Sequence, residues 1–275
     1  MKKSIMIAIV AFIAIGTAFA ANPASDFEYG LSNDGKYVVI YGFKNQKSTY
    51  VLPETIEDFP VKKVDVSRKS AYRIFGNAKQ GTITISKTIS SFELWIEEVS
   101  NTIIIDGLSE NIQEFFVFSD DRAPYSGMSS EPSGKYKPIL IKGIELLTRA
   151  KSVVCRNVQF DKVSLTVKKV WAPHVFSNTN LEEISFENGI KETGWHSKGC
   201  VGFAYNKKLR IVNLPSSMEV IGEGTFDSCI NLKDLIIPDE ISDLDFHDGY
   251  STFRNTALPL KTQALLKQLG YNGYL

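Results

Sequence analysis

The sequence contains three histidines and three cysteines, and these are its first candidates for metal ligands or catalytic residues. His196 and Cys200 lie four residues apart and could both reach one metal ion, but zinc sites use three or four protein ligands. Cys155 and His174 could act as a nucleophile and its base, yet nothing in the sequence brings them together. We therefore interpret the segment around His196 as a surface insertion loop, and we predict no catalytic pair.

Acidic residues are abundant, but their pattern does not predict a metal site. One pair is formed by Asp120 and Asp121. A denser run lies between residues 239 and 248: Asp239, Glu240, Asp243, Asp245 and Asp248. Calcium loops place oxygen ligands at alternate positions around a central glycine and end in a bidentate glutamate, and neither group has this pattern. A solvated acidic face accounts for both groups.

Sequence signatures of catalysis are also missing. The chain contains no GxSxG, no HExxH, no phosphate loop and no dinucleotide fingerprint. We therefore expect no catalytic residues, no metal and no cofactor. Because 31 acidic residues can place two carboxylates close together by chance, a glycan-acting hydrolase stays the least favoured of the alternatives.

The first 20 residues have the pattern of a secretory signal peptide. Lys2 and Lys3 give a positive start, residues 5–15 form an apolar run, and residues 18–20 supply an A-x-A cleavage site. A spanning helix needs about 20 apolar residues, so a retained anchor is the weaker alternative, and no later apolar run is long enough. We expect an exported protein, at the cell surface or secreted, with the periplasm as the alternative.

Charge and cysteine content narrow the class of protein further. The chain has 31 basic and 31 acidic residues, and removal of Lys2 and Lys3 leaves 29 basic residues and a net charge of −2. Nucleic-acid-binding proteins carry a basic patch, so no nucleic-acid partner is expected. At least one of Cys155, Cys200 and Cys229 is unpaired within the chain. Whether two of them pair is left open, and the fold must be stabilised by an apolar core.

An internal repeat runs through the C-terminal half. Residues 209–229 and 232–253 share apolar positions at an offset of 23, and residues 181–203 share them with a short insertion. In residues 209–229 these positions are Leu209, Val212, Leu214, Pro215, Met218 and Ile221, and Phe226 matches Phe253 at an offset of 27. The two-residue alternation indicates a strand, which a proline then ends. One such unit cannot bury its own apolar side, but stacked units bury a continuous core.

These residues resemble the BspA-type leucine-rich repeat of bacterial surface proteins, which residues 209–229 match nearly throughout. The unit at 181–203 has Glu187 in place of the proline, and the unit at 232–253 lacks the glycine and the cysteine. Residues 49–64 resemble the family's first unit. The resemblance implies a leucine-rich-repeat solenoid, mostly β, with one short strand per coil and irregular or short helical returns. It also implies a packing role for Cys229.

The predicted organisation has four parts. Residues 1–20 are the signal peptide, and 21–75 form an N-terminal cap and a first repeat-like unit. Residues 76–258 form the solenoid, degenerate over 76–175 and regular over 176–258, and 259–275 form a C-terminal capping helix. Residues 33–35 predict the turn of a capping β-hairpin. Strands are predicted at 82–85, 102–105, 115–118, 139–141 and 163–167, a loop at 120–138, and an apolar helix face at Leu260, Ala264, Leu265 and Leu269.

Residues between core positions of the strands should point outward and form the binding surface. By alternation, these are Thr84, Thr166, Ser185, Asn213 and Ile236. Trp195 and Tyr250 are large aromatics in polar insertions that break the repeat, and aromatics are enriched in binding hot spots. We predict ligand binding at these seven residues. The alternatives are a solvated sheet face for the first five and coverage of the coil edge for the two aromatics.

The resemblance implies an exported, non-enzymatic, adhesin-like interaction protein whose partner is a protein or a glycan. This expectation is based on the fold and on export, since a fold alone does not fix a function. A periplasmic scaffolding module is the second hypothesis. The sequence leaves the oligomeric state open.

Overall fold

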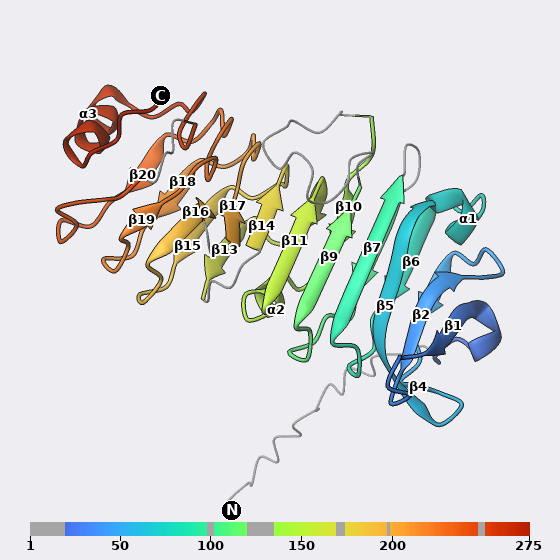
Figure 1. The fold of residues 1–275 in the computed structure, drawn as a ribbon. Helices are drawn as coiled ribbons and strands as arrows, with labels where there is room; N and C mark the ends of the chain where they lie inside the picture. The colour runs from blue at the N-terminus through green and yellow to red at the C-terminus, as the bar shows by residue number, and fades with distance from the viewer. Residues whose placement is uncertain (1–19, 98–101, 120–134, 169–173, 197–198, 247–250) are drawn as a thin grey trace, which may run out of the picture.

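The computed structural model describes residues 20–97, 102–119, 135–168, 174–196, 199–246 and 251–275. The predicted signal peptide therefore lies outside the described residues, apart from Ala20. The chain winds into a stack of coils, with a β-hairpin at one end and helix α3 (Leu260–Gln268) at the other (Figure 1).

Strands on opposite sides of the stack form three sheets. The long sheet has the order β1 (Phe27–Leu31), β2 (Val38–Phe43), β5 (Phe59–Ser70), β7 (Ser91–Glu97), β9 (Glu114–Phe118), β11 (Ser152–Arg156), β14 (His174–Ser177), β17 (Gly199–Gly202), β16 (Glu192–His196) and β19 (Val220–Ile221), with β4 (Thr55–Ile56) beside β5. The five-strand sheet has the order β12 (Val158–Phe160), β10 (Ile139–Ile141), β8 (Thr102–Asp106), β6 (Gln80–Thr84) and β3 (Thr49–Val51). The four-strand sheet has the order β13 (Ser164–Val167), β15 (Glu183–Phe186), β18 (Ile211–Asn213) and β20 (Asp234–Ile236).

The mostly β solenoid is confirmed, but the expectation of one strand per coil is wrong. Most coils contribute one strand to the long sheet and a second, also parallel to its neighbours, to the opposite sheet. The second strands lie in the part of each coil that was predicted to be irregular or helical. They can be very short, and β19 has only two residues. So short a strand shows no period-2 pattern. Within the described residues, only the 3-10 turn Ala24–Asp26 and the helices α1 (Ala71–Phe75) and α2 (Ile144–Leu147) add to α3.

The predicted hairpin cap is confirmed by the antiparallel pairing of β1 with β2. Gly35 adopts a φ of 69° in the turn, which glycine does without strain. Below the hairpin, the buried Asp26 carboxylate accepts hydrogen bonds from Asn22 (2.7 Å), Asn45 (2.9 Å) and Lys47. Burial on its own would raise the pKa of Asp26, but these bonds, Lys47 first, lower that pKa below 3.8.

The strands predicted in the degenerate middle are all present, as β6, β8, β9, β10 and β13. Most of the predicted loop at 120–138 lies outside the described residues. The prediction of an insertion loop around His196 is wrong, since residues 192–196 and 199–202 form the antiparallel strands β16 and β17. They enter the long sheet between β14 and β19, because the backbone groups of an insertion bordered by two strands can be satisfied by pairing with both.

Stacked phenylalanine rings run along the core of the regular coils. The ring centroids of Phe176, Phe203, Phe226 and Phe253 follow one another at 5.8, 5.9 and 5.7 Å, with interplanar angles of 6°, 12° and 18°. Tyr271 ends this phenylalanine spine by meeting the Phe253 ring edge-on at 5.3 Å. The repeated phenylalanines of the sequence therefore form one continuous contact from coil to coil.

A buried amide ties two of these coils together. Asn206 is fully buried, and its Nδ2 donates to the carbonyls of Phe176 and Phe203, both at 2.7 Å. Its Oδ1 accepts from the backbone N–H of Thr179 at 2.7 Å and from the Thr179 hydroxyl at 2.8 Å. One side chain thus satisfies several buried backbone and hydroxyl groups, as a dry core requires.

The face opposite the long sheet is interrupted within one coil. The five-strand sheet ends at β12 and the four-strand sheet begins at β13, with residues 161–163 between them. At this seam Asn180 takes the place of a neighbouring strand, because its Oδ1 accepts from the Phe160 N–H at 2.7 Å and its Nδ2 donates to the Phe160 carbonyl at 2.9 Å.

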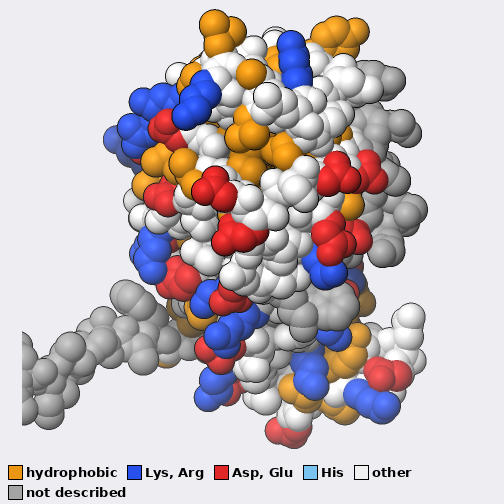
Figure 2. Space-filling view, turned by 90° about the vertical axis from the view of Figure 1, so that its left-hand side faces the viewer, with side chains coloured by type: hydrophobic (Ala, Val, Ile, Leu, Met, Phe, Trp, Pro, Cys, Tyr) orange, Lys and Arg blue, Asp and Glu red, His pale blue; other side chains and the backbone are white. Residues whose placement is uncertain are grey.

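The capping helix is confirmed, but its predicted buried face is partly wrong. Leu266 and Leu269 are buried with Tyr271, whereas Leu260 is 82% exposed and Leu265 is 39% exposed. The helix begins after Pro259 and is only nine residues long, so it turns a narrow face to the core and leaves the earlier leucines outside. In Figure 2, which views this end of the stack, apolar side chains are exposed in the upper part and acidic ones lie across the middle.

Candidate binding surfaces

Four of the predicted binding residues form one row across the four-strand sheet. Thr166 on β13 pairs with Ser185 on β15, Ser185 pairs with Asn213 on β18, and Asn213 pairs with Ile236 on β20. Thr166 is exposed, and Ile236 is 52% exposed. This polar row is therefore a ladder of small side chains that ends in one exposed apolar residue.

Hydrogen bonds hold the centre of the polar row in a fixed arrangement. Asn213 Nδ2 donates to Ser185 Oγ at 2.9 Å and to Glu183 Oε1 at 3.1 Å. Its amide oxygen and the exposed Thr166 hydroxyl can still serve a partner as hydrogen-bonding groups. The row suits a broad, shallow contact.

The other three predicted binding residues are not brought to this row. Thr84 lies on β6 of the five-strand sheet, opposite Val51 and Asp106. Trp195 lies on β16, where its backbone pairs with Cys200, and its side chain is outside the described part of the structure. Tyr250 also lies outside the described residues.

The cysteines that are described occupy the core. Cys155 and Cys229 are fully buried free thiols, and burial raises the pKa of both, to about 12 for Cys229. The Cys229 thiol donates to the Phe203 carbonyl at 3.2 Å, which agrees with a packing role. Opposite Cys155 in the sheet is Phe176, while His174 pairs with Val153. Among the described residues, no group of three or more His, Cys, Asp or Glu side chains is placed to hold a metal ion.

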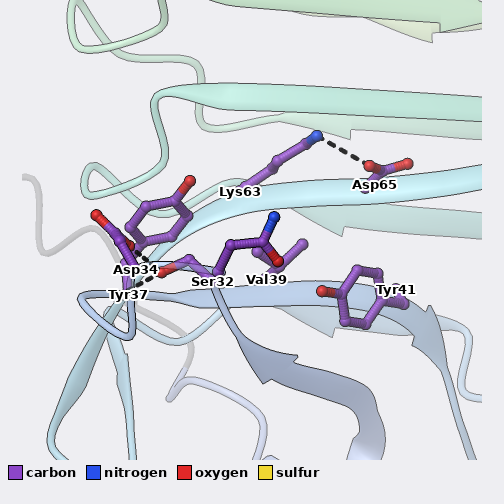
Figure 3. Close-up of a pocket in the computed structure, with 8 residues that line it drawn as sticks. Ser32, Asp34, Tyr37, Val39, Tyr41, Lys63 and Asp65 are labelled. Carbon is purple, nitrogen blue, oxygen red and sulfur yellow. Dashed lines mark hydrogen bonds and ion pairs between the residues drawn. The ribbon is translucent and has the colours of Figure 1, made fainter.

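A pocket of about 290 Å³ lies beside the hairpin, on the outer face of the long sheet. This hairpin pocket is lined by Ser32, Asn33, Asp34, Tyr37, Val39, Tyr41, Lys63 and Asp65. Figure 3 shows the lining residues of the hairpin turn and of β2 facing the Lys63–Asp65 pair on β5. The pocket therefore combines two phenol rings and an apolar floor with a polar border.

Electrostatic contacts continue from the pocket along the sheet. Lys63 Nζ lies 2.9 Å from Asp65 Oδ2, and this hydrogen bond, with the charges of Asp65, Glu93 and Glu114, raises the pKa of Lys63 although burial opposes it. Asp65 pairs with Glu93 on β7, and Ser91 pairs with Glu114 on β9. The pKa of the Glu93 carboxyl is raised by burial first and then by Asp65. One lysine is thus surrounded by three carboxyl groups.

Further along, the outer face of the long sheet becomes apolar. Phe118, Val154 and Val175 form a buried cluster separate from the main core, with Trp95 and Phe116 packed against it. They alternate with core residues along β7, β9, β11 and β14. The outer face of this sheet is therefore richer in aromatic side chains than the polar row opposite.

Sequence reasoning missed this outer face. The alternation of Tyr37, Val39 and Tyr41, in the segment predicted as the returning strand of the hairpin, could have indicated that these side chains share one face. The pairing that places Lys63 opposite Val39 joins residues 24 positions apart across an irregular register, and no local pattern gives such a pairing.

No helix in the described part of the chain is long and apolar enough to cross a membrane.

Comparison with known proteins agrees with the repeats. Residues 155–259 match the sequence model of the BspA type leucine rich repeat region, in six copies. Among solved structures, a leucine-rich-repeat protein of T. pallidum covers 92% of this chain and 98% of its own, at 16% sequence identity and a TM-score of 0.41. No curated protein matches the sequence. The matched residues contain the phenylalanine spine and the polar row, so residues similar to the BspA type leucine rich repeat build this candidate surface.

Proposed function

We propose that the protein is an exported, non-enzymatic, adhesin-like interaction protein that binds a protein or glycan partner through the exposed faces of its solenoid strands. The family match supports an interaction module. The signal-peptide pattern of residues 1–20 supports export. Together these observations favour a partner outside the cytoplasm.

The observation that carries the proposal is the polar row. Thr166, Ser185, Asn213 and Ile236 stand in register on four neighbouring strands, and strands lie about 4.8 Å apart, so the row spans about 14 Å. Small side chains on such a strip let the surface of a large partner approach closely. Trp195 and Tyr250 remain part of the proposal as aromatic contacts separate from the row.

The location test is protease accessibility on intact cells, compared with lysed cells. Digestion on intact cells is expected, because an adhesin faces outward. Survival of the protein until lysis would contradict the adhesin role and favour the periplasmic scaffolding module.

The binding test uses a partner recovered with the purified protein as bait. Asn213→Arg should lower affinity at least tenfold, because it places a long charged side chain in the middle of the polar row. Gln268→Arg, on the exposed side of α3, adds the same charge away from the row and should leave binding unchanged. Trp195→Ala and Tyr250→Ala test the two aromatics. If all three changes leave binding untouched, the partner is held by another surface.

A further inference from the structure

We infer that the hairpin pocket binds one sugar residue of a neutral glycan. This inference rests on the proposed binding function, and it adds a second contact site at the opposite end of the stack from α3 (Figure 1).

The apolar part of the pocket is built by alternate residues of one segment. Tyr37, just before β2, and Val39 and Tyr41 on β2 are spaced two residues apart and line the same pocket. Val39 is buried and forms the floor between the two tyrosines, whereas Tyr41 is 46% exposed. An exposed tyrosine ring gives a flat apolar face with a polar tip.

Gly30 keeps this part of the pocket open. It pairs with Val39 across the hairpin, and a Cβ placed on it would lie 3.4 Å from Cε2 of Tyr41. A larger side chain at residue 30 would therefore extend toward the Tyr41 ring. Because the backbone of Gly30 is not in the left-handed region, a substitution there fills space without backbone strain.

The polar border is held in place before any ligand arrives. Ser32 Oγ donates to Asp34 Oδ1 at 2.6 Å and accepts from the backbone N–H groups of Lys36 and Tyr37, both at 3.2 Å. The bond from Ser32 is the first cause that lowers the pKa of Asp34. On the other wall of the pocket, an ion pair between Lys63 and Asp65 holds both side chains in place. Fixed groups lose little freedom on binding, which favours affinity.

These groups match the chemistry of a pyranose ring. A sugar has a face of C–H bonds that packs on an aromatic ring and a rim of hydroxyls that both donate and accept. Tyr41 offers the ring, the carboxylates of Asp34 and Asp65 accept, and Asn33 and Lys63 donate. A volume of about 290 Å³ is just below the range for ligand sites, about 300–1,000 Å³, which suits one ring rather than a longer segment.

Charge selects a neutral sugar. Two carboxylates and one ammonium line the pocket, so a uronate or another anionic sugar would be repelled. A basic peptide side chain is the competing ligand, but Asp65 is already paired with Lys63, and Lys36 Nζ lies 3.5 Å from Asp34. Carboxylates with cations beside them attract a further cation weakly and still accept hydrogen bonds from hydroxyls.

The test is an immobilised panel of oligosaccharides that end in glucose, galactose, mannose or N-acetylglucosamine, with sialylated and uronate-ended glycans and a lysine-rich peptide beside them. The purified protein should bind at least one neutral glycan. Tyr41→Ala should lower that binding at least tenfold, and Gly30→Val should lower it although both rings remain. Tyr274→Ala removes a ring that is 68% exposed and should change nothing. Circular dichroism verifies that each variant is folded.

Three outcomes would overturn the inference: no neutral glycan is bound, neutral glycans bind equally to Tyr41→Ala, or only the lysine-rich peptide binds and Asp65→Asn releases it. A partner whose binding is lost in Asn213→Arg and kept in Tyr41→Ala would leave the proposed function standing and remove the sugar site alone. Binding lost in Tyr41→Ala and kept in Asn213→Arg would support the pocket and count against the polar row.

Discussion

Replacing Phe226 with alanine tests whether the stacked rings hold the coils of the solenoid together. Phe226 is fully buried, and it stacks on Phe203 at 5.9 Å and on Phe253 at 5.7 Å. It therefore contacts the coil before and the coil after its own. Its removal opens a cavity at a place where the neighbouring backbones, held by the sheets on both sides, cannot collapse inward.

The expected loss is large for a single residue. Phenylalanine-to-alanine changes in cores lower the free energy of unfolding by about 3–5 kcal/mol, and each aromatic pair adds about 0.5–1.5 kcal/mol beyond burial. With two pairs broken, we expect a loss at the upper end, about 4–5 kcal/mol. Whole domains are stable by about 5–15 kcal/mol, so this change alone should remove about a quarter of the stability or more.

Urea denaturation followed by circular dichroism measures this loss. Phe226→Leu keeps most of the volume and loses the ring, so its loss should be below about half of that for alanine. Tyr274→Ala, at a side chain that is 68% exposed, should stay within about 0.5 kcal/mol of the unchanged protein. A loss below about 1 kcal/mol for Phe226→Ala would refute the idea that the phenylalanine spine couples the coils.

Three further outcomes are expected. The folded pKa of Asp26 lies below 3.8, so its contribution to stability is present above pH 3.8 and is lost as the pH falls through the folded pKa. Asp26→Asn should therefore flatten the dependence of stability on pH below about pH 4. Unfolding measured over a series of acidic pH values would show this. Asn206→Ala should lower the urea stability by about 2–3 kcal/mol or more, because it leaves buried carbonyls without donors; an unchanged midpoint would contradict this role. In a Cys200→Ser variant, a thiol reagent at pH 8 should label no cysteine in the folded chain and two cysteines after denaturation. The reason is that Cys155 and Cys229 are buried and have raised pKa values. Rapid labelling of the folded chain would place one of them at the surface.

The regular repeats were predictable because the spacing of their apolar residues indicates which side chains face the core. Leu209, Val212 and Phe226 recur at fixed offsets, and the structure places all three in the core. The hairpin and the middle strands follow equally from turn residues and apolar alternation. Strands as short as β19 could not be predicted, because two residues show no period and their pairing partners lie a whole coil away.

The candidate surfaces also differ in how far the sequence predicts them. Alternation alone predicts that Thr166, Ser185 and Asn213 point outward, and the equal register of successive repeats then aligns them. The hairpin pocket needs Lys63 beside Val39, across a bulge in the pairing of β2 with β5. A shift of one residue in that register would turn every side chain of β5 to the other face, so this contact depends on the bulge.

The seam between β12 and β13 has a mechanical consequence. A stack of coils resists bending where both of its faces are tied by continuous ladders of hydrogen bonds, and here only the long sheet runs through, by the pairing of β11 with β14. On the opposite face, residues 161–163 and the Asn180 side chain make the link. The molecule should therefore behave as two stiff blocks joined by a flexible link, with the hairpin pocket on one block and the polar row on the other. A rigid partner that touches both blocks would set the angle between them.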